Sequence, residues 1–369
     1  MQEERLEARI WNFPLRDRKE AQARGLTSQA NVSPEPFLQV SFRMLDELCR
    51  WTGRYLDATR AYFACFRDPA ALIQQIVDHR VRDGFSLNGY KFQLTILIEG
   101  LAAVDRWVGG DRQIAGLADE LKDVLRGFYR ASGFCYFEEG YLPQDLDTSA
   151  AITRVLSADA DVVRAYDALL ERNRLGGEGL YPTWLDAPDW ETWSCGSTPW
   201  HAETMLNSWL TQAHLGRDVD LRLVRWVVET AGLRNHWYVQ RLFTPYLYYR
   251  VLRALRATSL PEMLLPVRAF LTSPPQPNTS FTDERHLTLI RQSQHVALDR
   301  LLTHLLTCAA FPAPRPPAPV LGEASDFDDV VVYWSLGHVP YRSVAVARAF
   351  TASLLGAFAP TVTSGWAAE

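Results

Sequence analysis

Two aspartates stand two residues apart in the segment Gln144–Ala151, directly before an apolar helical run. Asp147 occupies the position expected of a helix N-cap, where a side chain accepts hydrogen bonds from free backbone amides, and Asp145 precedes the helix. Carboxylates this close disfavour each other's ionisation, and burial acts in the same direction. The pair therefore predicts a carboxylic acid that keeps its proton near neutral pH and can protonate a carbon–carbon double bond.

The residues around this pair favour a buried acid over an exposed N-cap with a neighbouring carboxylate. Tyr136, Phe137 and Tyr141 lead into the pair, so it is approached from an aromatic side. Thr148 and Ser149 follow it, and their hydroxyls can donate hydrogen bonds that fix the orientation of the carboxyl groups.

A second group of polar residues lies in the segment from Trp200 to Trp209. Glu203 and Asn207 are four residues apart and share one face of the predicted helix. A buried asparagine needs hydrogen-bond partners, so Asn207 is predicted to hold the Asp147 carboxyl; a structural role in bonding a nearby loop fits equally well. His201 and Glu203 also match the His-x-Glu motif of zinc deaminases. That family requires a Pro-Cys-x-x-Cys motif downstream, which is absent, so no metal site is predicted.

Aromatic residues are abundant, with 12 Trp, 14 Tyr and 17 Phe. Aromatic faces stabilise cations without supplying a nucleophile, as a carbocation reaction requires, although a lipid-binding cavity would use them too. The residues that we predict to contact a substrate are Thr148, Trp184, Trp193, Trp200, Glu203, Trp209, Tyr238, Phe243, Tyr246, Tyr341 and Phe350. A second acidic motif, Asp326–Asp329, follows a Pro-rich stretch and is predicted to be a solvated turn.

Composition excludes several classes of protein. The net charge of −5 and the scarcity of lysine argue against nucleic-acid binding. The five cysteines form no Cys-x-x-Cys pair, which fits a reducing cytosol, and we expect a cytoplasmic protein without a signal peptide or membrane span. Walker, GxGxxG and GxSxG motifs are absent, as is the DDxxD motif that holds magnesium against a diphosphate.

Helical periodicity dominates the chain from Phe37 onward, and only Val330–Tyr333 resembles a strand. About a dozen helices without strands to pack on predict an all-α fold. The sequence has no repeat of fixed period, which would have indicated a solenoid. We expect a single (α/α)6 barrel of antiparallel helical hairpins over residues 36–358, with an arm at 1–35 and a tail at 359–369. The predicted helices span 37–55, 70–79, 90–108, 114–130, 149–156, 160–173, 201–215, 221–231, 245–257, 261–271, 288–308 (with a possible break) and 343–358.

Four segments, taken in order, resemble the class II terpene cyclases, the group that includes squalene–hopene cyclase. Asp145–Ala150 is similar to their Asp-x-Asp-Asp/Thr-Thr-Ala motif, with Ser149 in place of the second threonine. The other three resemble an acidic-x-x-x-Asn segment, a Tyr-rich helix entry and the Tyr-x-Ser-x-Ala start of a final helix. These are Glu203–Asn207, Trp237–Tyr246 and Tyr341–Phe350, and the similarity extends over roughly residues 40 to 357.

The length suits a single barrel, as in monodomain cyclases of the merosterolic acid synthase type, which cyclise prenylated aromatic compounds. The resemblance implies that Asp147 protonates the terminal alkene of a linear polyprenyl substrate and that Asp145 tunes and orients it. It implies no cofactor, with Mg²⁺ required only if the substrate is a diphosphate. An isoprenoid substrate would bring transient membrane contact, and the oligomeric state is left open.

Three other hypotheses remain open on the sequence. One is a cyclase of free prenyl diphosphates, which would need a basic pocket. Another is a carbohydrate-active α/α toroid with two separated carboxylates and sugar-stacking tryptophans. The last is a non-catalytic barrel that binds isoprenoids or a partner.

Overall fold

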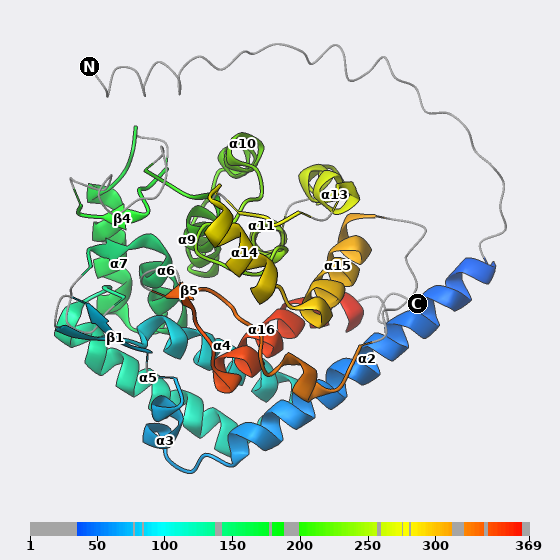
Figure 1. The fold of residues 1–369 in the computed structure, drawn as a ribbon, viewed down its shortest axis with the longest axis horizontal. Helices are drawn as coiled ribbons and strands as arrows, with labels where there is room; N and C mark the ends of the chain where they lie inside the picture. Colours follow the sequence, from blue (N-terminus) through cyan, green and yellow to red (C-terminus); the bar gives the residue numbers. More distant parts are fainter. Residues whose placement is uncertain are drawn as a thin grey trace.

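The computed structural model describes residues 35–363, except 77, 83–84, 137–141, 177–178, 188–198, 257–259, 275, 280–281, 312–320 and 336–338. The predicted arm at 1–35 lies almost entirely outside this range. The described chain is mostly helical, as predicted (Figure 1). Its α-helices are α2 Glu35–Ala64, α3 Pro69–Gln74, α4 Lys91–Val108, α5 Arg112–Ser132, α6 Leu146–Val155, α7 Ala160–Arg172, α9 Ala202–His214, α10 Leu221–Ala231, α11 Phe243–Ala254, α12 Leu260–Met263, α13 Leu265–Thr272, α14 Glu284–Ser293, α15 Val296–Ala310 and α16 Val344–Thr363.

Aspartate N-caps begin many of these helices. The side chains of the capping residues accept hydrogen bonds from backbone amides in the first turn of the helix. These caps are Asp68, Asp111, Asp145, Asp159, Asp220 and Asp283. Asp145 is the buried one of the six, whereas the others are exposed or half-buried. An aspartate cap is thus an ordinary local signal in this chain, and burial is what distinguishes Asp145.

Helices α4, α6, α9 and α11 pack one against the next in chain order, and α16 packs along α4 (Figure 1). Backbone carbonyls of α16 also accept hydrogen bonds from Tyr246 and Arg253 of α11, so α11 and α16 are in contact as well. Large parts of α4, α9 and α11 are buried on every side, as expected of helices surrounded by other helices.

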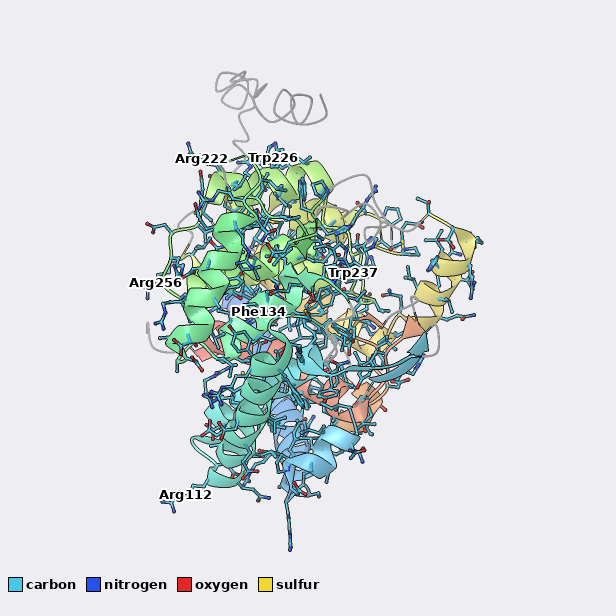
Figure 2. The ribbon with its side chains drawn as sticks, turned by 90° about the vertical axis from the view of Figure 1, so that its left-hand side faces the viewer. Arg112, Phe134, Arg222, Trp226, Trp237 and Arg256 are labelled. Atoms are coloured by element: carbon cyan, nitrogen blue, oxygen red, sulfur yellow. The ribbon has the colours of Figure 1, made fainter. Side chains whose placement is uncertain are left out.

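Helices α5, α7 and α10 lie outside this group and are amphipathic. In α5 the buried residues recur every three or four positions, at Ile114, Leu117, Leu121 and Leu125. Figure 2 shows α5 running between Arg112 and Phe134, while Arg222 and Trp226 mark α10 at the far edge of the molecule. The inner helices therefore carry the buried polar residues, and the outer ones cover them.

Helix α16 approaches α4 closely because glycines stand at the crossing. A Cβ atom added to Gly100 would lie 2.5 Å from the backbone of Ala349, and one added to Gly356 would lie 2.8 Å from the Cβ of Ala103. Gly100 directly follows Glu99, so this tight crossing also fixes the position of that glutamate.

Three short antiparallel strand pairs interrupt the helices: β1 Asp78–Arg82 with β2 Phe85–Gly89, β3 Gln144–Asp145 with β4 Trp184–Leu185, and β5 Trp334–Ser335 with β6 Val339–Pro340. The prediction of a helix up to residue 79 was wrong, because α3 ends at Gln74 and the backbone of Asp78–Arg82 pairs with β2 instead. Within Val330–Tyr333, which resembled a strand, Tyr333 forms an isolated bridge with Tyr238.

Other helix boundaries differ from the prediction in detail. The helix expected at 261–271 is divided into α12 and α13, and the one expected at 288–308 is broken at Gln294–His295. Helix α16 continues to Thr363, so the predicted tail at 359–369 begins inside this helix. No helix in the described part of the chain is long and apolar enough to cross a membrane.

Candidate active site

Asp145, and not Asp147, is the N-cap of α6. Asp145 has extended backbone dihedral angles, and its Oδ1 accepts a hydrogen bond of 2.6 Å from the Thr148 amide. Asp147 lies in the first helical turn. The assignment of the cap from the sequence was therefore wrong by two residues, because pairing of Gln144 and Asp145 with β4 sets where the helix begins. The correction leaves the Asp147 carboxyl available for tertiary contacts.

Asp147 is buried and binds two side chains from distant parts of the sequence. Asn207 Nδ2 donates to its Oδ1 at 2.6 Å, and the Tyr238 hydroxyl donates to its Oδ2 at 2.5 Å. Burial raises the pKa of Asp147 to about 6, while the two donors act in the opposite direction because they stabilise the carboxylate. Asp147 is thus an acid that keeps its proton to a higher pH than an ordinary aspartate, and its conjugate base is stabilised by the two donors.

The Asp145 carboxyl has fewer partners. Its Oδ2 is buried and has no hydrogen-bond partner among the described residues. Burial raises the pKa of Asp145 to about 7, and the neighbouring charge of Asp147 adds to the increase. Ser149 donates its hydroxyl to the Asp145 backbone carbonyl and not to a carboxylate, so the predicted role of that hydroxyl differs from the observed one.

Glu203 holds the loop that carries Tyr238. Its Oε1 accepts hydrogen bonds from the backbone amides of His236 at 2.5 Å and Trp237 at 3.1 Å. Burial raises the pKa of Glu203 to about 7. Glu203 and Asn207 are one turn apart on the same face of α9. This face therefore carries one donor to Asp147, Asn207, and through Glu203 holds the loop that carries the other donor, Tyr238.

Arg154 lies next to Asn207. Its guanidinium donates to Asn207 Oδ1 at 2.6 Å, to Thr211 Oγ1 at 2.9 Å and to Glu99 Oε1 at 2.5 Å. The second oxygen of Glu99 lies 3.8 Å from Arg250 of α11. Despite burial, the charges of the two arginines hold the pKa of Glu99 below its usual range. A chain of charged and polar groups therefore joins α4, α6, α9 and α11.

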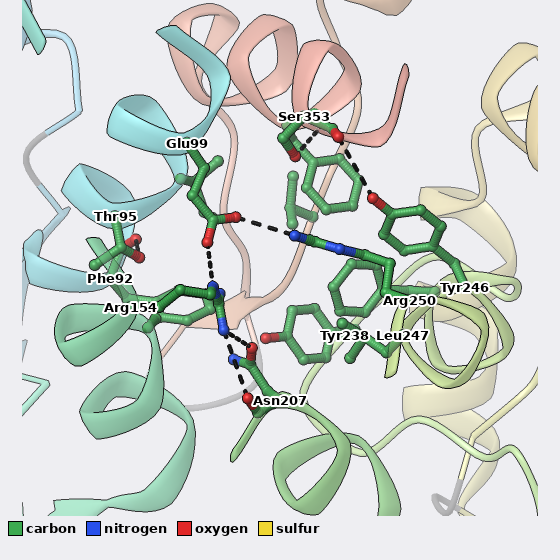
Figure 3. A pocket seen from close by; sticks show the side chains of 15 residues that line it. Phe92, Thr95, Glu99, Arg154, Asn207, Tyr238, Tyr246, Leu247, Arg250 and Ser353 are labelled. Carbon is green, nitrogen blue, oxygen red and sulfur yellow. Dashed lines mark hydrogen bonds and ion pairs between the residues drawn. The ribbon is translucent and has the colours of Figure 1, made fainter. Parts of the chain in front are cut away.

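A pocket opens beside this network (Figure 3). Its walls are single faces of several helices, because the lining residues of each helix recur three, four or seven positions apart. The lining residues are Phe92, Thr95, Ile96 and Glu99 of α4; Ala151 and Arg154 of α6; Asn207 of α9; Phe243, Tyr246, Leu247 and Arg250 of α11; Phe350 and Ser353 of α16; and Tyr238 and Val332 from loops. Asn207 and Tyr238, which bind Asp147, are both part of the wall.

Four of the residues predicted to contact a substrate line this pocket: Tyr238, Phe243, Tyr246 and Phe350. Their rings form a continuous wall. The ring centroids of Tyr238 and Phe243 are 3.9 Å apart, and that of Phe350 is 5.2 Å from Phe243. Aromatic rings from three segments are thus gathered in the wall that also contains the two Asp147 donors, Asn207 and Tyr238, although Asp147 itself is not a lining residue.

The other predicted contact residues do not line this pocket. Thr148 and Trp209 are buried elsewhere, and Glu203 acts on a loop as described above. Trp184 packs edge-on against Trp237, which Figure 2 labels, Trp200 lies against Trp226, and the Tyr341 hydroxyl donates to the Ile76 carbonyl at 2.5 Å. Trp193 lies outside the described residues. High aromatic content in a sequence does not separate these core positions from pocket positions.

Three charged residues at the pocket were missed in the sequence: Glu99, Arg154 and Arg250. A signal for Arg154 existed, since it follows Asp147 by seven residues and so lies on the same face of α6. Glu99 also interrupts an apolar helix, and a charge at such a position needs a partner.

The remaining polar motifs are structural. In the second acidic motif Asp326 and Asp329 are exposed, as predicted for a solvated turn, while Asp328 is half-buried and pairs with Arg348. His201 is buried and lies 2.8 Å from the Thr183 hydroxyl, and burial lowers its pKa to about 4. The described residues contain no cluster of His, Cys, Asp and Glu that could hold a metal ion.

No protein-family model matches the sequence, and no curated protein matches it. Among solved structures, the fold is similar to that of the type II terpene cyclase MstE from Scytonema, a variant in complex with its substrate geranylgeranyl dihydroxybenzoate. The TM-score is 0.47 with 15% identity, and the match covers 86% of this chain and 99% of that chain.

Proposed function

We propose that this protein is a class II terpene cyclase in which Asp147 donates the initiating proton. The observation that carries the proposal is a buried carboxyl held by two hydrogen-bond donors, Asn207 and Tyr238, that themselves line an aromatic pocket. A carboxylic acid in this setting is both desolvated and stabilised as its conjugate base, which are the requirements for protonating a very weak base. Asp147 is 8% exposed and does not itself line the pocket, whereas both of its donors do.

In the proposed reaction, the proton moves from the Asp147 carboxyl to the terminal alkene carbon of a linear polyprenyl chain. The alkene π electrons form the new C–H bond, leaving a tertiary carbocation and the Asp147 carboxylate. Internal alkenes then attack the cation in turn, closing rings along the wall of Tyr238, Phe243 and Phe350, whose faces stabilise positive charge. Loss of a proton to water or a weak base ends the reaction as an isomerisation, and solvent returns a proton to Asp147.

The pocket charges favour a substrate with an anionic group. The pocket lining contains two guanidinium groups, Arg154 and Arg250, and one carboxylate, Glu99. Arg154 is bound by three protein partners, whereas Arg250 has a 3.8 Å ion pair and the Tyr246 ring at 5.6 Å. A carbocation beside a guanidinium is destabilised unless an anion compensates. We therefore propose a prenylated aromatic acid as the substrate, with a free prenyl diphosphate as the second candidate.

We also propose that α4, α6, α9, α11 and α16 are inner helices of an α/α barrel. Their sequential packing supports this, as does the return of α16 to α4. The barrel would enclose the pocket, and the amphipathic helices α5, α7 and α10 would form part of its outer layer.

Two other functions make different demands on the same residues. A glycosidase needs two carboxyl groups facing a sugar across an open site. Asp145 and Glu203 are instead bonded to backbone amides. A non-catalytic isoprenoid-binding protein would use the aromatic pocket but would have no need of a buried acid with stabilising donors.

The test is to incubate purified protein with farnesylated and geranylgeranylated aromatic acids, farnesyl and geranylgeranyl diphosphates and the corresponding alcohols, with and without EDTA. Products are compared by mass spectrometry and retention time. We expect an isomer of the substrate that is lost in Asp147→Asn and retained in Asp167→Asn, a matched control at an exposed ion pair with Arg217. Tight binding of unchanged substrate by the wild-type protein would favour the binding-protein alternative, and binding of soluble glycans would favour the glycosidase.

A further inference from the structure

The function of Asn207 depends on which end of its amide faces Asp147. Only the Nδ2 group can donate a hydrogen bond to a carboxylate, because Oδ1 is an acceptor. A rotated amide would place Oδ1 against Asp147 Oδ1 and replace an attraction with a repulsion. Some other group must therefore select the orientation in which Nδ2 points toward the acid.

Arg154 makes that selection because a guanidinium has hydrogen-bond donors and no acceptor. It lies 2.6 Å from Asn207 Oδ1, so the amide oxygen must face Arg154 and the amide nitrogen must face Asp147. The same guanidinium nitrogen lies 2.9 Å from the Thr211 hydroxyl, which donates to the Ala150 carbonyl at 2.9 Å. These contacts connect α6 and α9 at the level of the acid.

Glu99 fixes Arg154 from the opposite side. Its Oε1 accepts from Arg154 Nε at 2.5 Å, and the arginine side chain is 10% exposed. Glu99 is placed on α4 one residue before the tight crossing with α16 at Gly100. The three helices that carry Glu99, Arg154 and Asn207 therefore converge on one chain of hydrogen bonds that ends at Asp147. Figure 3 shows the part of this chain from Glu99 through Arg154 to Asn207.

We propose that Glu99 and Arg154 are positioning residues that orient the Asn207 amide and so set the acid strength of Asp147. This inference rests on the proposed function of Asp147 as the proton donor. The positive charge of Arg154 also favours the Asp147 carboxylate, which lowers the pKa of Asp147 against the effect of burial. The titratable and charged groups around this chain are Asp145, Glu203, Tyr238, Arg250 and His214.

Two substitutions at position 154 separate orientation from charge. Arg154→Lys keeps the charge, but its single nitrogen cannot reproduce the fork that joins Glu99 to Asn207 and Thr211. Arg154→Met removes both the positive charge and the fork of hydrogen-bond donors. We expect kcat to fall on the order of 10-fold to 100-fold in both variants, the range for groups that orient a functional residue, with a smaller change in KM. Both variants are expected to move the alkaline fall of kcat to higher pH, because both disturb the Asn207 donor, and Arg154→Met is expected to move it further because it also removes the positive charge.

Glu99→Gln is a third variant that retains the size of the side chain, and it is expected to lower kcat with little change in this pH profile. Arg217→Met, at an exposed ion pair in the loop that follows α9, is the matched arginine control and is expected to leave kcat unchanged. A folded Arg154→Met protein with an unshifted pH profile and normal kcat would overturn the inference. A change confined to KM would also overturn it, since Arg154 would then act in substrate binding.

A measurement without turnover separates this inference from the proposed function. In protein labelled with ¹³C at aspartate carboxyl groups, the Asp147 resonance can be assigned by its loss in Asp147→Asn. The inference predicts that the Asp147 pKa increases from wild type to Arg154→Lys and again to Arg154→Met. Equal values in all three proteins would refute it, even for a cyclase. A shift in a protein that converts no substrate would support the positioning and reject the proposed catalysis.

Discussion

Asn207 Nδ2 lies 2.6 Å from Asp147 Oδ1, although 60 residues separate them in the chain. The contact joins the first turn of α6 to the centre of α9. Asn207 is 3% exposed and Asp147 is 8% exposed, so water contributes little to stabilising the carboxylate and the amide becomes correspondingly important.

Replacing Asn207 with alanine is expected to lower kcat by about 10²-fold, because one preorganised donor to a developing charge is lost. The Asp147 pKa should rise in the same variant. Steady-state kinetics with the best substrate of the panel provides the measurement. Asn173→Ala, which removes a surface contact with Asp186, serves as the control. Full activity in Asn207→Ala would show that the amide has no part in proton transfer.

Tyr238→Phe removes the second donor and keeps the ring that packs on Phe243. The hydroxyl lowers the pKa of Asp147, so its loss should raise that pKa and reduce kcat by roughly 10-fold to 100-fold. KM should change little because the aromatic surface remains. Tyr248→Phe is the matched control, since that hydroxyl donates to the Met263 carbonyl away from the pocket. Equal effects of the two substitutions would contradict a specific role of Tyr238.

Cyclisation should be faster at acidic than at alkaline pH. The protonated form of Asp147 is the reactive one, and its pKa is about 6, so activity should be retained below that value and fall as pH rises through it. An apolar substrate would raise this pKa further by excluding water. A pH–rate profile from pH 5 to 8.5 checks the expectation. A rate that increases over this interval would require a deprotonated group in place of the acid.

Asp145→Asn is expected to stabilise the folded protein at alkaline pH. Burial raises the pKa of Asp145 to about 7 from an ordinary value of 3.8, so the folded state binds a proton more tightly than the unfolded state. The resulting stability is fully present below the ordinary value and is lost as pH rises through about 7. Asparagine caps a helix as well as aspartate does and carries no charge.

The melting temperature of Asp145→Asn at pH 8 should therefore exceed that of wild type by at least ~2 °C, and the difference should shrink toward pH 4. Thermal unfolding followed by circular dichroism across this range measures it. Asp159→Asn, at the half-buried cap of α7, is the control for replacing an aspartate cap by asparagine. A constant difference between Asp145→Asn and wild type at every pH would argue against a buried, proton-binding Asp145.

Gly100→Ala is expected to destabilise the protein by roughly 1–3 kcal/mol, the usual cost of overpacking. The added methyl group would meet the backbone of Ala349 at 2.5 Å, and backbone cannot yield as a flexible side chain does. Gly127→Ala in α5 is the control, because no atom lies within 4 Å of its added Cβ and it should stabilise the helix by about 0.5–1 kcal/mol. Chemical denaturation measures both, and equal stability of the two variants would disprove the tight crossing.

The sequence alone determined most of the helices and the main residues of the site. Helices are predictable because apolar residues recur with the helical period and because aspartate caps act within four residues. The carboxylate pair was also predicted. The link to Asn207 was one of two roles that fitted equally well, since a buried asparagine on an apolar helix requires some partner. The strand at Asp78–Arg82 was missed because its hydrogen bonds come from a neighbouring strand and not from its own residues.

Only the tertiary structure decided which aspartate caps α6 and which one meets the donors. The choice depends on pairing of Asp145 with Trp184, a contact between segments far apart in the chain. The tertiary structure also decided that Glu99, Arg154 and Arg250 lie together and that Trp209 and Tyr341 do not line the pocket. Local periodicity identifies the buried face of a helix, but which buried residue borders a cavity depends on the packing of several helices.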